Sequence, residues 1–299
     1  MIIQTSELVN RIASVVRANR RTRAIQVLSL LAGVILFFSL SLHLAQAAPI
    51  NYGSFMGNTV TYVDVTENSA TDPQYFPPVV FPPNPAAGLY GKPVVSGDSL
   101  DFMPINFFAI SDFRAPPFDH TDGHLTFMVV AKPLKAIENI RFDEGGSLRL
   151  AGFGTDATFV DVSAVGFINV LEVDGVPISK QRIDLDFRFN FGSNGVLMDN
   201  GTWRLASQGI VNGFLWKGGQ FVDIKQILQS RGIPVTFGAT KISVALDNSL
   251  LAQSELLAGA FIDKKDFGGL SITVNIPEPA SVLLVGIGLA GLVAFRRRG

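Results

Sequence analysis

The 299-residue chain contains no cysteine and only three histidines, two tryptophans and four tyrosines. Without cysteine it can form no disulfide, thiol nucleophile, cysteine-ligated zinc site or iron–sulfur cluster. This absence does not argue against export, because a chain of this length can bury a sufficient core without disulfides. Phenylalanine, with 24 copies, dominates the aromatic residues. Open sugar-binding platforms favour tryptophan and tyrosine, so this usage counts against a dedicated lectin site.

Catalytic motifs are also missing. The sequence has no Gly-x-Ser-x-Gly elbow, no phosphate-binding loop and no dinucleotide fingerprint. Pairs of carboxylates for glycoside hydrolysis could be chosen in many ways from the acidic residues, so no pair stands out. We therefore predict that the protein is not an enzyme, with no catalytic residues and no cofactor. An exported hydrolase acting on matrix polysaccharide is the alternative.

The formal net charge of −1 hides an uneven distribution. Residues 1–47 carry five arginines and one glutamate, and residues 277–299 carry three arginines and one glutamate. The middle of the chain is left with 16 basic and 23 acidic residues, a net charge of −7. No basic stripe with interleaved aromatic residues is present, so we expect no binding to nucleic acid.

The N-terminal segment has the three parts of a signal peptide. Residues 20–23 read Arg-Arg-Thr-Arg, residues 25–44 are uncharged and mostly apolar, and small residues follow at Ala45, Ala47 and Ala48. We predict entry into the general secretory machinery and cleavage by signal peptidase after Ala47. The apolar run is also close to the length of a membrane-spanning helix, so an uncleaved anchor is the alternative.

The C-terminal segment carries a second signal. Pro277, Glu278 and Pro279 precede sixteen apolar residues, 280–295, and the chain then reads Arg296, Arg297, Arg298 and Gly299. The apolar run predicts a transmembrane helix whose reach is extended by the arginine side chains. Since basic residues stay on the cytoplasmic side, the three arginines determine topology and put the middle domain outside.

These C-terminal residues resemble the PEP-CTERM sorting domain of exported proteins from exopolysaccharide-producing Gram-negative bacteria. The resemblance covers residues 276–299 and is specific, because tripeptide, apolar helix and arginines occur in the required order at the end of the chain. It implies that an exosortase recognises Pro277, Glu278 and Pro279 and removes the tail. We therefore divide the chain into a signal peptide (1–47), an exported domain (48–276) and a sorting and anchor segment (277–299).

The exported domain is predicted to be mainly β, an antiparallel β-sandwich-like fold with one short helix. Residues 181–190 alternate strictly between apolar and charged side chains, which is typical of a strand with one wet face. Further strands are expected at 59–65, 125–131, 147–153, 158–173, 202–216, 242–246 and 270–276, with a helix at 220–230 that ends at Gly232. Seven prolines between Pro73 and Pro93 predict a long loop or extended arm.

One segment could bind a metal ion. His120, Asp122 and His124 lie within six residues, and two imidazoles with a carboxylate suit a divalent cation. The surrounding prolines and the Asp122-Gly123 pair favour an ordinary exposed loop before a strand. A calcium- or metal-stabilised adhesion module stays open as an alternative on this basis.

The sequence predicts an exported cell-surface or extracellular-matrix protein. Its path runs through the inner membrane, with the domain on the outer side, to the cell envelope or matrix. Association with extracellular polysaccharide in a biofilm follows from the resemblance, not from the residues of the domain.

Overall fold

A computed structural model of the chain describes residues 49–69, 88–104, 106–112, 118–191, 197–198, 201–265 and 270–275. The chain divides into two compact units, Met1–Gln46 and Ala47–Gly299, and all described residues belong to the second. The predicted signal peptide, the sorting segment and most of the proline-rich segment lie outside the described residues. No helix within the described ranges is long and apolar enough to cross a membrane.

The first of two sheets, called sheet A, runs in the order β1-β2-β6-β14-β8-β12, and β9 also pairs with β8. Its long central strands alternate buried and half-exposed residues, as expected where one face meets a core and the other meets solvent. The bounds are β1 Ile50–Met56, β2 Val60–Ser69, β6 Phe118–Ala131, β8 Phe159–Val173, β9 Val176–Asp186, β12 Gly201–Arg204 and β14 Ala239–Gln253.

The second sheet, sheet B, runs in the order β11-β10-β13-β7-β16-β4-β3, and β15 joins β7 to β5. β13 pairs along one edge of β7, while β16 and β15 share the other edge end to end. The bounds are β3 Val94–Ser96, β4 Ser99–Phe102, β5 Phe108–Ser111, β7 Asn139–Gly152, β10 Arg188–Phe191, β11 Leu197–Met198, β13 Val211–Asp223, β15 Ala258–Lys264 and β16 Leu270–Asn275. All pairings between these strands, in both sheets, are antiparallel.

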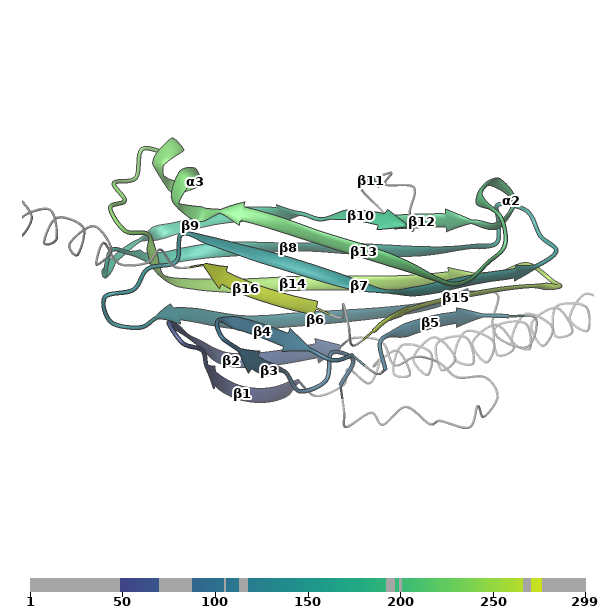
Figure 1. Cartoon of the computed structure of the whole chain (residues 1–299), viewed down its shortest axis with the longest axis horizontal. Coiled ribbons are helices and arrows are strands. Elements are labelled where there is room, and N and C mark those ends of the chain that lie inside the picture. The colour runs from purple at the N-terminus through teal and green to yellow at the C-terminus, as the bar shows by residue number, and fades with distance from the viewer. Residues whose placement is uncertain are drawn as a thin grey trace, which may run out of the picture. The chain divides into compact units, whose positions relative to one another are not determined.

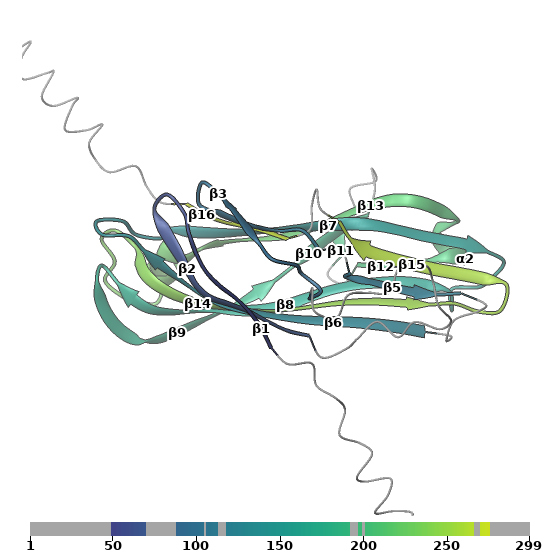
Figure 2. The same cartoon turned by 90° about the horizontal axis from the view of Figure 1, so that it is seen from below.

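The two sheets lie face to face, as the two views in Figures 1 and 2 show, and one apolar cluster fills the space between them. Trp203 of sheet A packs against Phe214 of sheet B with ring centroids 5.2 Å apart. The hydroxyl of Tyr62, on β2, crosses the core to donate to the carbonyl of Ile272 on β16 at 3.1 Å. Among the described residues, six phenylalanines are buried in this core: Phe102, Phe107, Phe127, Phe142, Phe187 and Phe189.

The prediction of a mainly β, antiparallel domain is confirmed. The alternating segment 181–190 is extended, with Ile183, Leu185, Phe187 and Phe189 buried on one side. The structure adds that the chain leaves sheet A at Asp186 and joins sheet B at Arg188, so the segment is shared by β9 and β10. The apolar face stays continuous because both sheets face the same core.

Four local predictions are corrected. The single strand expected at 202–216 is divided into β12 and β13, with residues 205–210 outside both. The segment around His120 and His124 is not a loop: it forms the first half of β6, paired with β14 along its length. β14 does not end near Asp247 but continues to Gln253. The predicted helix 220–230 begins only at Ile224 as α3 (Ile224–Ser230), because residues 220–223 pair with β7.

Helix ends follow ordinary capping. The carboxylate of Asp223 accepts from the amide of Gln226 at 2.8 Å and starts α3, and Gly232, with a φ of 73°, follows its end. A second helix that the sequence did not predict, α2 (Leu205–Gln208), is a single turn between β12 and β13. Both helices still pack against the core, through Leu205 of α2 and Ile224 and Leu228 of α3.

Candidate functional site

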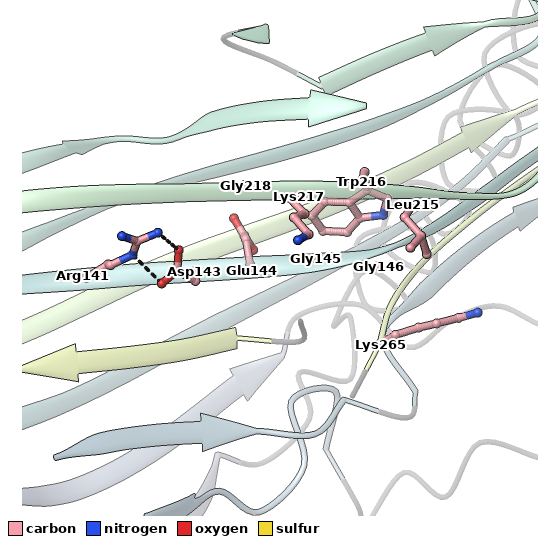
Figure 3. Close-up of a pocket in the computed structure, with 10 residues that line it drawn as sticks. All are labelled: Arg141, Asp143, Glu144, Gly145, Gly146, Leu215, Trp216, Lys217, Gly218 and Lys265. Atoms are coloured by element: carbon pink, nitrogen blue, oxygen red, sulfur yellow. Dashed lines mark hydrogen bonds and ion pairs between the residues drawn. The ribbon is translucent and has the colours of Figure 1, made fainter. Parts of the chain in front are cut away.

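A groove crosses the outer face of sheet B, over β10, β13 and β7. It has two adjoining parts, with volumes of about 460 Å³ and about 330 Å³. Both parts share Arg141, Asp143, Lys217 and Gly218, and Figure 3 shows the smaller part. The other lining residues are Glu144, Gly145, Gly146, Arg188, Asn190, Leu215, Trp216, Gly219, Gln220, Phe221 and Lys265. We call this feature the sheet B groove.

Glycine forms the floor of the groove. Gly219 stands opposite Asp143 on β7, and Gly145 stands opposite Lys217 on β13. A Cβ atom at Gly219 would lie 2.7 Å from the carbonyl oxygen of Phe142, so a larger residue is not accommodated without a shift. Because glycine has no side chain, the outward face of the sheet is hollow at these positions. The long side chains that flank them form the walls of the groove.

The groove is basic although the domain is acidic. Its outward charged lining residues are Arg141, Arg188, Lys217 and Lys265 against Asp143, and Asp186 and Asp263 beside the groove pair with Arg188 and Lys265. Arg141 binds Asp143 through two hydrogen bonds of 2.7 and 2.9 Å, which are drawn in Figure 3. Lys217 is exposed and makes no ion pair with any residue that the structure describes. This lysine therefore keeps its charge available for an anionic group.

Directly beneath the groove lies a buried polar cluster of Glu144, Lys264 and Asn248. The carboxylate of Glu144 pairs with the ammonium group of Lys264, and both side chains are fully buried. Lys264 also donates to the amide oxygen of Asn248 at 2.7 Å. Asn248 in turn donates to the hydroxyl of Tyr90 at 3.1 Å, and Tyr90 donates to the carbonyl of Gly123 at 2.6 Å.

Burial acts on both charges of this pair. It lowers the pKa of Lys264, with the Glu144 carboxylate acting in the opposite direction. It raises the pKa of Glu144, with the Lys264 ammonium acting in the opposite direction. Both shifts favour the neutral forms, an amine beside a carboxylic acid. The Oε1 atom of Glu144 has no hydrogen-bond partner among the described residues.

This cluster was not predicted from the sequence, although each of the three strands carries a signal for it. In β15 the buried positions are Ala258, Ala260, Ile262 and then Lys264, so the lysine continues the apolar face. Glu144 continues the buried positions of β7 in the same way, and Asn248 those of β14. A polar residue in phase with a buried face must find a polar partner, because the alternative is an unsatisfied group in the core.

The predicted metal ligands all lie on β6 and point to the outer face of sheet A. Two residues four apart in a strand are separated by about 13 Å, so His120 and His124 do not converge. Within the described part of the chain, no three side chains of the metal-binding types gather into a cluster. His120 instead hydrogen-bonds Ser249 at 2.6 Å. Asp122 forms a hydrogen bond with Asp247 on the neighbouring strand.

The remaining predicted sites concern sorting and cleavage. All of their residues lie outside the part of the chain that the structure describes. They are the cleavage residues Ala45, Ala47 and Ala48, the motif Pro277, Glu278 and Pro279, and the arginines 296–298. Their roles stay predictions from the sequence. β16 ends at Asn275, so the last described strand of sheet B leads directly to the C-terminal signal.

Comparisons with known proteins support one part of this picture. Among curated proteins, none matches the chain. Solved structures give only remote similarity. The catalytic domain of Humicola grisea Cel12A, in complex with a soaked thio cellotetraose, is 11% identical over 77% of this chain and 99% of its own, with a TM-score of 0.17. A VP2 subviral particle of infectious bursal disease virus is 10% identical over 77% of this chain and 58% of its own, with a TM-score of 0.12. Similarities this weak indicate neither a shared fold nor a shared function.

The C-terminal segment, by contrast, matches a family model described as the PEP-CTERM protein-sorting motif, over residues 275–298. The match includes the Pro-Glu-Pro tripeptide, the apolar run and the three arginines. This chain carries a PEP-CTERM sorting motif at its C-terminus, and it is an exported protein targeted to exosortase.

Proposed function

We propose that the β domain is a non-catalytic cell-surface or matrix protein that associates with extracellular polysaccharide through the sheet B groove. The observation that carries the proposal is a basic groove on an otherwise acidic, exported domain. Repulsion from the domain as a whole would keep anionic polymers away. A local excess of arginine and lysine gives such a polymer one favourable place to bind.

The shape of the groove suits an extended chain. From Phe221 to Leu215 it follows β13 for six residue steps, a span of about 20 Å. Phe221 and Leu215 are both exposed and offer apolar surface to sugar rings, while Arg141, Asp143 and Lys217 offer charged hydrogen-bonding groups. Exposed phenylalanine serves sugar stacking less well than tryptophan or tyrosine, so we expect moderate affinity, strengthened by many contacts along one polymer.

Sorting completes the proposal. Exosortase targeting brings the domain to the outer side of the inner membrane and into a processing step there. We propose that the processed domain then resides in the cell envelope or the matrix, where polysaccharide is abundant. The predicted transmembrane helix at 280–295 would hold the protein only until that step.

The test is cosedimentation of the purified protein with the exopolysaccharide of the producing strain. We expect binding that weakens as salt is raised, because exposed charges are screened. Lys217→Glu should raise the Kd by about tenfold or more, since about 1.4 kcal/mol of lost interaction is a factor of ten. Lys180→Glu, the same charge change at an exposed position of β9 on sheet A, is the matched control.

Two results would count against the proposal. Wild-type protein that does not cosediment at low salt lacks the proposed association. Equal weakening by the groove variant and by Lys180→Glu would mean that net charge, not the groove, determines binding. Release of soluble reducing ends from the polysaccharide during the assay would instead favour an exported hydrolase.

A further inference from the structure

We propose that the side chains of Lys264 and Asn248 join through an intramolecular isopeptide bond, with Glu144 as the acid–base group that promotes it. The three side chains meet in the core of the domain from three different strands, β15, β14 and β7. The cluster lies beneath the groove and shares Glu144 with its lining, but the inference does not depend on polysaccharide binding.

The reacting groups are already adjacent. The Nζ atom of Lys264 lies 2.7 Å from the Oδ1 atom of Asn248, which is bonded to the carbon that the amine would attack. On its other side, Nζ contacts the Oε2 atom of Glu144. A nucleophile held in contact with its electrophile needs little further ordering, which removes much of the entropic barrier to a slow acyl transfer.

The surroundings keep the amine nucleophilic. The Nζ atom lies 5.3 Å from the ring centroid of Phe107 and 5.6 Å from that of Trp216, and the lysine side chain is fully buried. Such desolvation lowers the pKa of Lys264 and raises that of Glu144, and both shifts favour the neutral amine and the carboxylic acid. A free amine and a carboxylic acid are the forms that the reaction requires.

The step balances without any other reagent. The lone pair of Nζ attacks the carbonyl carbon of Asn248 and forms a tetrahedral intermediate. Glu144 donates its proton to the departing Nδ2 atom and accepts one from Nζ, as a general acid and then a general base. The carbon–Nδ2 bond breaks, the new carbon–Nζ bond remains, and one molecule of ammonia leaves. Nothing is oxidised or reduced.

Tyr90 holds the amide in the required orientation. Its hydroxyl accepts from Nδ2 of Asn248 at 3.1 Å, which turns Oδ1 toward the lysine, and donates to the carbonyl of Gly123. Burial raises the pKa of Tyr90 well above its usual range, so the phenol stays neutral. At Gly123, a Cβ atom would lie 2.7 Å from the ring of Phe107 and 3.0 Å from that of Tyr90, so only glycine leaves both rings in place.

The bond would connect the two sheets. Asn248 lies in the middle of β14 in sheet A, and Lys264 is the last residue of β15 in sheet B. A covalent link there closes a ring between positions sixteen residues apart and restricts the unfolded chain in the way a disulfide does. The isopeptide bond would give this cysteine-free exported protein a covalent cross-link in place of a disulfide.

The experiment is intact-mass measurement on the folded, full-length chain, followed by digestion with trypsin and a glutamate-specific protease. We expect a mass lower than the sequence mass by one ammonia. Cleavage after Glu255 separates Asn248 from Lys264 in an unlinked chain, so we also expect a branched peptide that holds both residues. Lys264→Met and Glu144→Gln should each restore the full mass, while Lys265→Met, at the exposed neighbour, should leave the bond intact.

The proposal is overturned by a folded wild-type chain of full mass that releases Asn248 and Lys264 on separate peptides. Loss of ammonia with separate peptides would overturn it as well, since a cyclised asparagine explains that result. A branched peptide in folded Glu144→Gln protein would remove Glu144 from the mechanism. The decisive measurement is the mass and the peptides of the wild-type protein. It therefore tests the proposal even if a variant of the buried cluster fails to fold.

Discussion

The carboxyl group of Asp122 on β6 is hydrogen-bonded to that of Asp247 on β14. Both face outward from sheet A as diagonal neighbours, because Asp122 stands opposite Ser249 and Asp247 stands opposite His124. For glycoside hydrolysis two carboxyl groups must flank a sugar bond at about 5 Å or more, and a directly bonded pair leaves no room for one. Burial and the neighbouring carboxyl group raise the pKa of Asp122, so the protonation of Asp122 affects stability.

Stability should depend on pH through Asp122. Partial burial, followed by the charge of Asp247 and the hydrogen bond to it, raises the pKa of Asp122 to about 6. A carboxyl whose pKa is raised on folding binds more protons in the folded state, so its contribution falls as pH rises through about 6. We expect Asp122→Asn to leave the Tm nearly unchanged at about pH 3, below the ordinary pKa of the carboxyl, and to raise it at about pH 7.5.

Thermal unfolding at the two pH values measures this difference. Asp184→Asn, at an exposed position on β9 whose ion pair with Arg182 is open to solvent, is the control and should show little change at either pH. A Tm increase of equal size at both pH values would show that the substitution acts through packing, not through the protonation of Asp122.

The turn between β8 and β9 offers a test of backbone strain. Asp174 and Gly175 have φ angles of 50° and 81° and connect the paired residues Val173 and Val176. A Cβ atom at Gly175 would meet nothing within 4 Å, so Gly175→Ala introduces strain without a clash. We expect a loss of about 1 kcal/mol in the free energy of unfolding, measured with urea. Gly175→Asn should lose less, because asparagine tolerates this conformation better.

Tyr62 tests the polar contact between the sheets. Its buried hydroxyl donates to the carbonyl of Asp98 at 2.5 Å and to that of Ile272 at 3.1 Å. Tyr62→Phe removes the donor and keeps the ring, so two carbonyl groups lose a partner. We expect a loss of about 1 to 2 kcal/mol in the free energy of unfolding. Tyr52→Phe, which removes the bond to Glu67 from a less buried ring, should cost less.

The alternation of polar and apolar residues predicted strands correctly where one face of the strand meets solvent and the other meets the core. Residues 181–190 were identified on that pattern alone, and their inward residues are buried as expected. The crossing from sheet A to sheet B after Asp186 could not be predicted, because alternation continues unchanged across it. The hairpin at Asp174-Gly175 was readable from the sequence and was missed.

Local propensity failed where tertiary pairing decides the structure. Asp119, Asp122 and Gly123 are typical loop residues, yet β14 pairs with the whole segment and carries it into sheet A. The Glu144–Lys264–Asn248 cluster was out of reach for another reason. Its members are separated by 16 and 120 positions, and only the pairing of β15 with β7 and the packing of the sheets bring them together. The sequence could show that each lay on a buried face, but not that they met.

The sorting motif gives the last prediction. In the native host we expect a mature protein that begins at Ala48 and lacks the tail after Pro279. Glu278→Gln removes the single charge of the tripeptide and keeps its shape, so exosortase recognition should fail and the tail should be retained. Intact mass of the protein from membrane, envelope and medium fractions measures both ends of the chain at once.

Ser281→Ala, two residues beyond the motif, is the control for changes in the tail and should be processed normally. If even the wild type keeps Arg296–Arg298 and stays in the inner membrane, the tail is a simple anchor. The domain would then face the periplasmic side without release, and the proposed role in the matrix would lose its main support. A processed wild type beside a retained Glu278→Gln variant instead links release to the carboxylate, since the two chains differ only in that group.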